Sequence, residues 1–215
     1  MKGLLSPDSK FGRLFYGLGY LIILSWLWLL CSIPIFTIGA ASSALYDIAR
    51  RVVEGTERKV ASDYFASFRS NFKQATPIWL IIMLVSAVLC YSLGFFMFLN
   101  TESSLVKLII LIIAVIIACF LSWVQVVFAY LARFEDTAKT AAKNSFIMCI
   151  LNPLSVIWIV VQAAAIVYLI SVIPFVTWLP TILSLTPGCY CALSVAPIER
   201  IFKQYIPKEE PEEET

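Results

Sequence analysis

Few residues in this chain of 215 could support catalysis, and most of them stand in or beside apolar sequence. The chain has no histidine, which removes the most common zinc ligand and the usual proton shuttle near neutral pH. No GxxxxGKS/T loop that could cradle a phosphate occurs either. Composition therefore excludes a zinc enzyme and a Ser-His-Asp hydrolase, and we predict no catalytic residue, metal ligand or cofactor site.

Six cysteines remain as nucleophiles, and all of them fall inside or at the ends of apolar runs. Free cysteine in such surroundings packs as a small hydrophobic residue. One residue separates Cys189 from Cys191, and no histidine accompanies them, so this pair does not resemble a metal motif. We therefore predict structural roles for the set, which is Cys31, Cys90, Cys119, Cys149, Cys189 and Cys191.

Asp47 is the strongest single candidate for a functional residue because it follows a long run of uncharged, mostly apolar residues. A charge within a membrane span is costly and often marks an ion path or a polar pair. The simpler interpretation places Asp47 at the depth of the membrane interface, where it pairs with Arg50 or Arg51. We favour this simpler interpretation.

Three uncharged polar residues, Gln125, Asn152 and Gln162, stand in apolar segments. Such groups often form hydrogen bonds between helices, each worth about 0.6–2 kcal/mol. A polar passage for a sugar would instead need several carboxamides and aromatic rings to converge. We favour structural hydrogen bonding for all three residues.

Four further residues are candidates for docking a cytoplasmic partner: Arg69, Lys73, Arg133 and Glu135. Arg133 and Glu135 stand, with Asp136, at the inner end of a predicted span. The alternative for these three is a cluster of mutually paired charges at the membrane surface, with the arginine stem along apolar surface. We favour the paired cluster.

The elements that position these residues are set by four runs that contain no charge. Together the runs hold 141 of the 215 residues, and 60% of the chain is apolar, against about 45–50% in soluble domains. One membrane span needs about 20 apolar residues. We therefore predict an all-α, polytopic transmembrane helix bundle of about six spans, with five possible. The predicted spans are residues 14–33, 37–53, 77–99, 105–132, 146–171 and 177–197.

Basic residues help decide between five and six spans because they collect on the cytoplasmic side of a membrane. If the first run is a hairpin broken at Pro34, six spans result and both termini are cytoplasmic. In that case 15 of the 16 Lys and Arg residues lie inside. If residues 14–40 cross once, the inside count falls to 12. We prefer six spans, although Asp47 then lies within the second span, near its cytoplasmic end.

Residues 60–74, between the second and third spans, have aromatic side chains at helical spacing, namely Tyr64, Phe65, Phe68 and Phe72. We predict an interfacial amphipathic helix on the inner membrane surface. A helix packed on the cytoplasmic ends of the bundle needs the same residues and stays open as the alternative. Residues 1–206 are predicted as a single transmembrane domain, and 207–215 as a disordered acidic tail.

Four stretches of the sequence, residues 28–41, 44–46, 63–76 and 130–135, resemble a known family. The most specific motif is Pro-x-x-Thr-Ile-Gly-Ala at residues 34–40. Together the stretches resemble the YesL-like membrane proteins, a family of unknown function called DUF624, over most of the chain. The resemblance implies a multi-pass protein of the bacterial plasma membrane, encoded near sugar-uptake transporters. It carries over no catalytic residue and no substrate.

We expect a non-enzymatic accessory or assembly component linked to carbohydrate uptake, an expectation that rests on the family resemblance. The expected partners are the lipid bilayer and a sugar ABC transporter permease or other membrane protein, with no nucleic acid. The alternative is a small secondary transporter or channel acting alone, which needs a polar pathway near Asp47 and Gln125. An intramembrane enzyme is disfavoured because it would need paired carboxylates or a base within the membrane.

Overall fold

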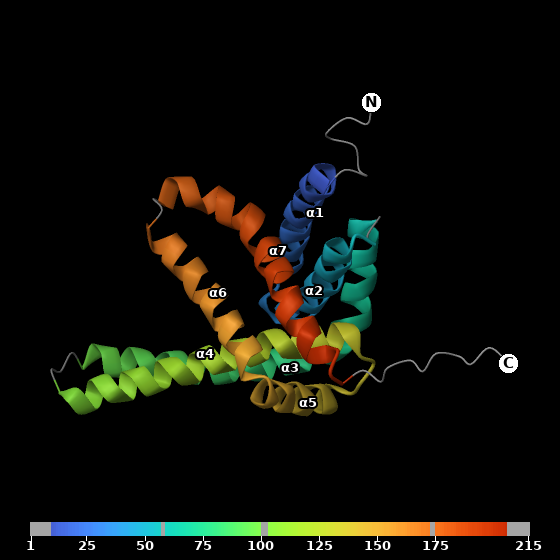
Figure 1. The fold of residues 1–215 in the computed structure, drawn as a ribbon. Helices are drawn as coiled ribbons and strands as arrows, with labels where there is room; N and C mark the ends of the chain where they lie inside the picture. The colour runs from blue at the N-terminus through green and yellow to red at the C-terminus, as the bar shows by residue number, and fades with distance from the viewer. Residues whose placement is uncertain (1–9, 57–58, 100–102, 173–174, 206–215) are drawn as a thin grey trace.

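The computed structural model describes residues 10–56, 59–99, 103–172 and 175–205, and every regular element in these ranges is a helix (Figure 1). The predicted all-α fold class is confirmed for these residues. The acidic tail predicted at 207–215 lies outside them. The elements are α1 (Lys10–Cys31), η1 (Ile35–Thr37), α2 (Ile38–Glu54), α3 (Val60–Phe98), α4 (Ser104–Arg133), α5 (Ala138–Leu151), α6 (Pro153–Val172) and α7 (Phe175–Phe202).

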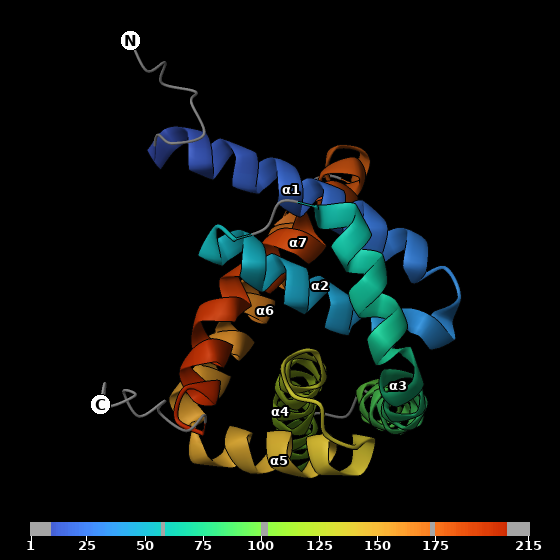
Figure 2. The same ribbon diagram turned by 90° about the vertical axis from the view of Figure 1, so that its right-hand side faces the viewer.

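The helix α2 lies at the centre of the bundle and packs against α1, α3, α4 and α7 (Figure 2). Most of its residues between Gly39 and Ala49 are buried, and many of them are glycine, alanine or serine. Small side chains let neighbouring helices approach closely. The buried stretch includes Asp47, so a carboxylate lies inside the bundle. After Glu54 the helix ends at Gly55, whose φ of 73° suits glycine.

The turn between α1 and α2 is held by residues of the Pro-x-x-Thr-Ile-Gly motif. The helix α1 ends at Cys31, and the hydroxyl of Thr37 lies within hydrogen-bonding distance of the carbonyls of Cys31 and Pro34. Trp79 of α3 also contacts this turn, and its indole Nε1 donates to the carbonyl of Ile35 at 2.7 Å. The chain therefore breaks near Pro34, as the sequence predicts, and α2 folds back against α1.

The helix α3 joins two segments that are predicted as separate, the amphipathic helix at 60–74 and the span at 77–99. It runs from Val60 to Phe98 with Pro77 inside it, and Figures 1 and 2 show that it changes direction along its length. Proline removes one N–H and clashes with the preceding turn, so it kinks a helix without always ending it. No glycine or other proline occurs between residues 60 and 76 to stop the helix earlier.

The first part of α3 packs on the bundle through its aromatic face. Tyr64 is fully buried, and its hydroxyl donates to the carbonyl of Ala41 in α2 at 3.1 Å. Phe68 and Phe72 are partly buried against the core, whereas Phe65 is exposed. The segment therefore packs on the bundle, and its position relative to the membrane surface stays a prediction. The aromatic face lies against α2 because this packing buries Tyr64 and satisfies its hydroxyl.

Among the described residues, α3 and α4 are long and apolar enough to cross a membrane. A bent pair, α5 with α6, would make a third span if it were one crossing, and the apolar stretch Tyr16–Cys31 is shorter. Almost none of the residues in the most apolar stretches of α3 and α4 are buried within the chain. Exposed apolar surface of this extent marks contact with lipid or with a partner. These features are those of a membrane protein with two or three candidate spans.

The predicted fifth span, residues 146–171, is divided in the structure. The helix α5 ends at Leu151, α6 begins at Pro153, and the two helices meet at a bend of 96°. Pro153 has no N–H with which to continue α5. The side-chain amide of Asn152 donates back to the carbonyl of Met148 at 2.9 Å, which satisfies one acceptor at the end of α5. Residues 146–151 therefore belong to α5, which packs against α3 and α4 (Figure 1).

The helix α7 closes the bundle by packing against α1, α2 and α6. At Gly188 it approaches α1 so closely that a Cβ atom there would lie 2.3 Å from the carbonyl oxygen of Leu21. The N–H of Gly188 donates to the hydroxyl of Ser25 at 3.0 Å. Further along α7, Ile198 and Phe202 are fully buried. This packing brings the end of α7, including Glu199, beside α2 and α4.

Candidate functional site

A cavity of about 790 Å³ lies where the second half of α2, the first part of α3 and the end of α4 meet. Ala66, Ser70 and Glu135 are exposed members of its lining, so the cavity reaches the surface of the molecule. Most of the lining side chains are polar or charged. The lining comprises Asp47, Arg51, Asp63, Ala66, Ser67, Ser70, Asn71, Gln74, Leu131, Ala132, Arg133, Phe134 and Glu135.

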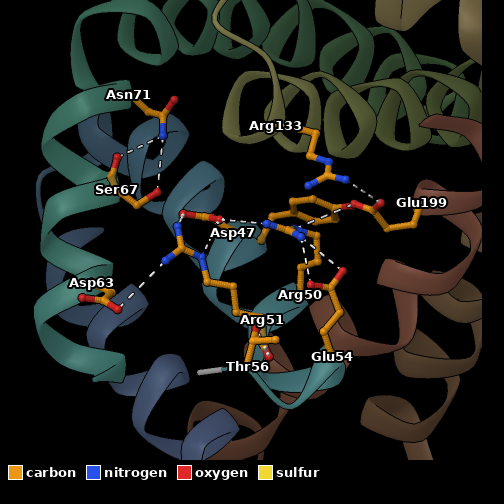
Figure 3. Close-up of polar contacts among 11 residues, drawn as sticks. Asp47, Arg50, Arg51, Glu54, Thr56, Asp63, Ser67, Asn71, Arg133 and Glu199 are labelled. Carbon is orange, nitrogen blue, oxygen red and sulfur yellow. Dashed lines mark hydrogen bonds and ion pairs between the residues drawn. The ribbon is translucent and has the colours of Figure 1, made fainter. Parts of the chain in front are cut away.

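Asp47 is the buried carboxylate of this cavity, with 6% of the residue exposed. Its two oxygens accept hydrogen bonds from Arg51, one turn further along α2, at 3.1 Å from Nε and 2.9 Å from Nη2 (Figure 3). Arg50 Nη2 lies 3.7 Å from Oδ1 of the same carboxylate. Two parallel N–H donors on one carboxylate form the strong, bidentate kind of pair. Asp47 thus lies in the polar pair that the simpler interpretation of the sequence predicts.

Glu199 supplies a second buried carboxylate from α7, with 8% of the residue exposed. It accepts a hydrogen bond from the hydroxyl of Tyr46 at 3.1 Å. Arg133 Nη2 lies 3.6 Å from Oε2, and Arg50 Nε lies 3.9 Å from Oε1 (Figure 3). A carboxylate at this depth needs such partners because an unpaired buried charge is costly. Arg50 contacts both Asp47 and Glu199, so one network joins α2, α4 and α7.

The wall of the cavity formed by α3 adds neutral polar groups to these charges. The side-chain amide of Asn71 donates to the carbonyl of Ser67 at 3.0 Å and lies 3.4 Å from its hydroxyl (Figure 3). Asp63 Oδ2 lies 4.0 Å from Arg51 Nη1, which links this wall to α2. The cavity therefore presents carboxylates, guanidinium groups, hydroxyls and amides within a small volume. This set suits hydrogen-bonded recognition of a polar group or of a charged side chain.

Gln125, Gln162 and Asn152 form their hydrogen bonds outside this cavity. Gln125 Oε1 in α4 accepts from the hydroxyl of Tyr190 in α7 at 2.9 Å. Gln162 Oε1 in α6 accepts from the hydroxyl of Ser194 in α7 at 2.9 Å. Asn152 bonds at the end of α5, as described above. Gln125 and Gln162 therefore join helices to one another, Asn152 caps the end of its own helix, and none of the three lines the cavity around Asp47.

The four predicted docking residues divide into two pairs. Arg133 and Glu135 both line the cavity, so the structure brings them together with Asp47. Arg133 pairs with Glu199 of α7, a residue outside the cluster of Arg133, Glu135 and Asp136 that the sequence predicts to be mutually paired. Arg69 and Lys73 are exposed on α3 and are not part of the lining.

Glu199 is not among the functional residues predicted from the sequence, although a signal for it exists. Asp47, Arg133 and Glu199 are each the first charge after one of the charge-free runs. Charges at the ends of apolar spans lie at similar depth when the spans end on the same side of the membrane. Asp47 and Glu199 both contact Arg50, and Arg133 contacts Glu199, so the ends of the runs predict the cluster better than any single motif does.

A smaller polar group beside the cavity was also missed. The hydroxyl of Tyr130 donates to Oδ2 of Asp136 and accepts from the side-chain amide of Asn144 at 3.0 Å. These bonds tie the end of α4 to the residues that follow it and to α5. The segment that carries Phe134 and Glu135 is thereby fixed at the edge of the cavity. In the described ranges, no group of three or more Cys, Asp or Glu side chains is arranged to hold a metal ion.

One comparison with known proteins gives a match. The sequence model of a family described as a protein of unknown function, DUF624, matches residues 21–93. No curated protein and no solved structure matches the chain. The matched segment contains the turn at Thr37, the whole of α2 and most of α3, and therefore Asp47 and Arg51. Residues 21–93 are thus similar to the DUF624 family, whose function is unknown.

Proposed function

We propose that this chain is a non-enzymatic accessory or assembly component linked to carbohydrate uptake, and that the cavity around Asp47 receives a segment of its partner. The proposed partner is a permease or ATPase subunit of a sugar ABC transporter. The link to carbohydrate rests on the resemblance to YesL-like proteins. The accessory role is supported by one observation, which is that the charged and polar groups gather in a cavity at one end of the bundle.

The position of the cavity favours a partner on the cytoplasmic side. With six spans, at residues 14–33, 37–53, 77–99, 105–132, 146–171 and 177–197, both termini are cytoplasmic, and so are the charges around the cavity. In this topology the fifth span contains the bend between α5 and α6. We propose this topology, in the bacterial plasma membrane, for the chain. A partner segment with polar or charged side chains would find donors and acceptors in Asp63, Ser67, Asn71 and Glu135. Hydrogen-bonded charge pairs of this kind fix the register and the choice of a partner.

The alternative function, a small transporter or channel acting alone, is supported by the buried charge of Asp47. A transport pathway needs polar groups that continue through the bundle from that charge. Gln125 and Gln162 bond to α7 instead, and Asp47 is held by Arg51. The accessory role is therefore the function that this arrangement supports best.

The proposal is tested by affinity purification in mild detergent from cells that express the sugar transporter. The variant Ala66→Arg places a large cation in the lining of the cavity, whereas Ala61→Arg places the same side chain on an exposed position of α3 outside the lining. We expect the unchanged chain and Ala61→Arg to recover the permease or ATPase, and Ala66→Arg to lose it. Failure of the unchanged chain to recover either subunit would sink the accessory role.

A further inference from the structure

A second cavity of about 420 Å³ lies between α3, α4 and α5, apart from the polar one. Its walls are formed by Ile78, Ile82 and Val85 of α3 and by Phe120 and Trp123 of α4, with small residues of α5 on the third side. Among its lining residues the one charged side chain is Lys139. The cavity is therefore an apolar groove with a cation at its edge.

The groove has fixed walls. The rings of Phe120 and Trp123 lie 5.7 Å apart, and the indole Nε1 of Trp123 is 3.2 Å from the hydroxyl of Ser145 and 3.3 Å from the carbonyl of Ala142, both in α5. These contacts hold α5 against α4. The wall formed by α3 begins at Pro77, which lies within that helix. Such a site is already built before any occupant arrives.

The surroundings of the groove are apolar and open. On α3, Ile81 lines the groove and is 64% exposed, and the neighbouring Leu84 is 69% exposed. Both α3 and α4 are long and apolar enough to cross a membrane. The groove therefore continues into surface that, in a membrane, faces acyl chains.

The cationic edge of the groove is available to a ligand. Lys139 and Lys143 are exposed and stand one turn apart on α5. In the described part of the chain, no carboxylate forms an ion pair with Lys139. Basic pockets between membrane helices bind the phosphates of anionic lipids. Each lysine near the membrane surface raises the affinity for such lipids about fivefold.

We propose that this groove is a binding site for one anionic phospholipid, with an acyl chain along the apolar walls and the phosphate at Lys139 and Lys143. Charge complementarity selects this occupant. A free phosphate ion would gain nothing from the apolar walls, and a zwitterionic lipid would gain less from the two lysines. The site is separate from the cavity around Asp47 and does not depend on the function proposed for that cavity.

Native mass spectrometry tests the proposal on the full chain in mild detergent. The protein is mixed with equal amounts of phosphatidylglycerol and phosphatidylcholine that carry the same acyl chains. We expect most complexes with one bound lipid to carry phosphatidylglycerol. Lys139→Ala should lower the excess of bound phosphatidylglycerol over bound phosphatidylcholine about fivefold. Lys203→Ala, which removes an exposed lysine at the end of the chain's last described helix, is the matched control and should leave the excess unchanged.

A second variant tests the apolar part of the site. Ala142→Phe fills the groove from α5, so it should lower binding of both lipids alike, whereas Lys139→Ala should affect the anionic lipid alone. The proposal is overturned if the unchanged chain binds both lipids equally, or if Lys203→Ala has the same effect as Lys139→Ala. Lys139 is exposed, so its variant carries the test even if Ala142→Phe does not fold.

Discussion

Tyr46 and Glu199 lie 153 positions apart in the sequence and meet in a hydrogen bond of 3.1 Å between the tyrosine hydroxyl and the carboxylate. Both residues are buried, so the bond joins α2 to α7 inside the bundle. Glu199 also contacts Arg50 and Arg133. Since Tyr46 and Arg50 fall within the segment matched to DUF624 and Glu199 does not, this contact connects that segment to the end of the chain.

Removing the hydroxyl of this pair should destabilise the bundle. Tyr46→Phe leaves Glu199 buried with one donor fewer, and hydrogen bonds to charged groups are worth about 1.5–3 kcal/mol. We expect the free energy of unfolding, measured by denaturant titration in detergent, to fall by about that amount. Tyr91→Phe is the matched control because Tyr91 is 76% exposed. The free energy of unfolding of this variant should equal that of the unchanged chain.

A double-mutant cycle separates this bond from other effects of the substitution. Glu199→Gln removes the charge that Tyr46, Arg50 and Arg133 share. If the effect of Tyr46→Phe comes from this bond, the substitution should lower the free energy of unfolding much less in the Glu199→Gln background than in the unchanged chain. Equal costs in the two backgrounds would contradict a direct contact between these residues.

The sequence predicts the local part of this site and not the distant part. Arg50 and Arg51 follow Asp47 by three and four positions, which places all three on one face of a helix, so their pairing follows from spacing. The contact with Glu199 depends instead on where α7 crosses α2. The position of α7 depends on packing with other helices, such as its close approach to α1 at Gly188, and no local pattern encodes it.

Two prolines show why helix boundaries were harder to predict than helices. Pro77 begins a predicted span, and Pro153 begins the observed helix α6. The helix α3 nevertheless continues through Pro77, whereas α5 ends before Pro153. Asn152 makes the difference at the second site because its amide satisfies a carbonyl at the end of α5. Hydrophobic periodicity shows that a segment is helical, but the continuity of the helix depends on such caps and on packing.

The proposed topology predicts opposite labelling of two single-cysteine variants. With six spans, a cysteine at residue 9 faces the cytoplasm and a cysteine at residue 103 faces outside. With five spans, where residues 14–40 cross once, both face outside. We expect an impermeant maleimide added to intact cells, in a background without the native cysteines, to label position 103 and spare position 9. Labelling of both positions from outside would refute six spans.

The role of Asp47 can be tested for both stability and transport. Asp47→Asn leaves Arg51, which is partly exposed, without its bidentate partner, so we expect a loss of about 1–2 kcal/mol in the free energy of unfolding. Proteoliposomes of the unchanged chain should take up no sugar above the level of empty liposomes, and Asp47→Asn should not differ from them. Uptake by the unchanged chain that Asp47→Asn abolishes would favour the alternative, a transporter acting alone.

The approach of α7 to α1 at Gly188 predicts a large effect from adding a single carbon atom. A Cβ at this position would lie 2.3 Å from the carbonyl oxygen of Leu21 and 2.9 Å from the hydroxyl of Ser25, so the helices must move apart. We expect Gly188→Ala to lower the free energy of unfolding by about 1–3 kcal/mol, the usual cost of overpacking.

The same shift should also reach the charged cluster, since Glu199 stands on α7. Tyr46→Phe should therefore lower the free energy of unfolding less in the Gly188→Ala background than in the unchanged chain. Gly94→Ala is the matched control: Gly94 is also within a helix, but a Cβ there meets no atom within 4 Å. Because alanine favours helix over glycine, this control should keep or slightly raise the free energy of unfolding. Equal destabilisation by the two substitutions would show that helix propensity, and not the approach of α7 to α1, governs the effect.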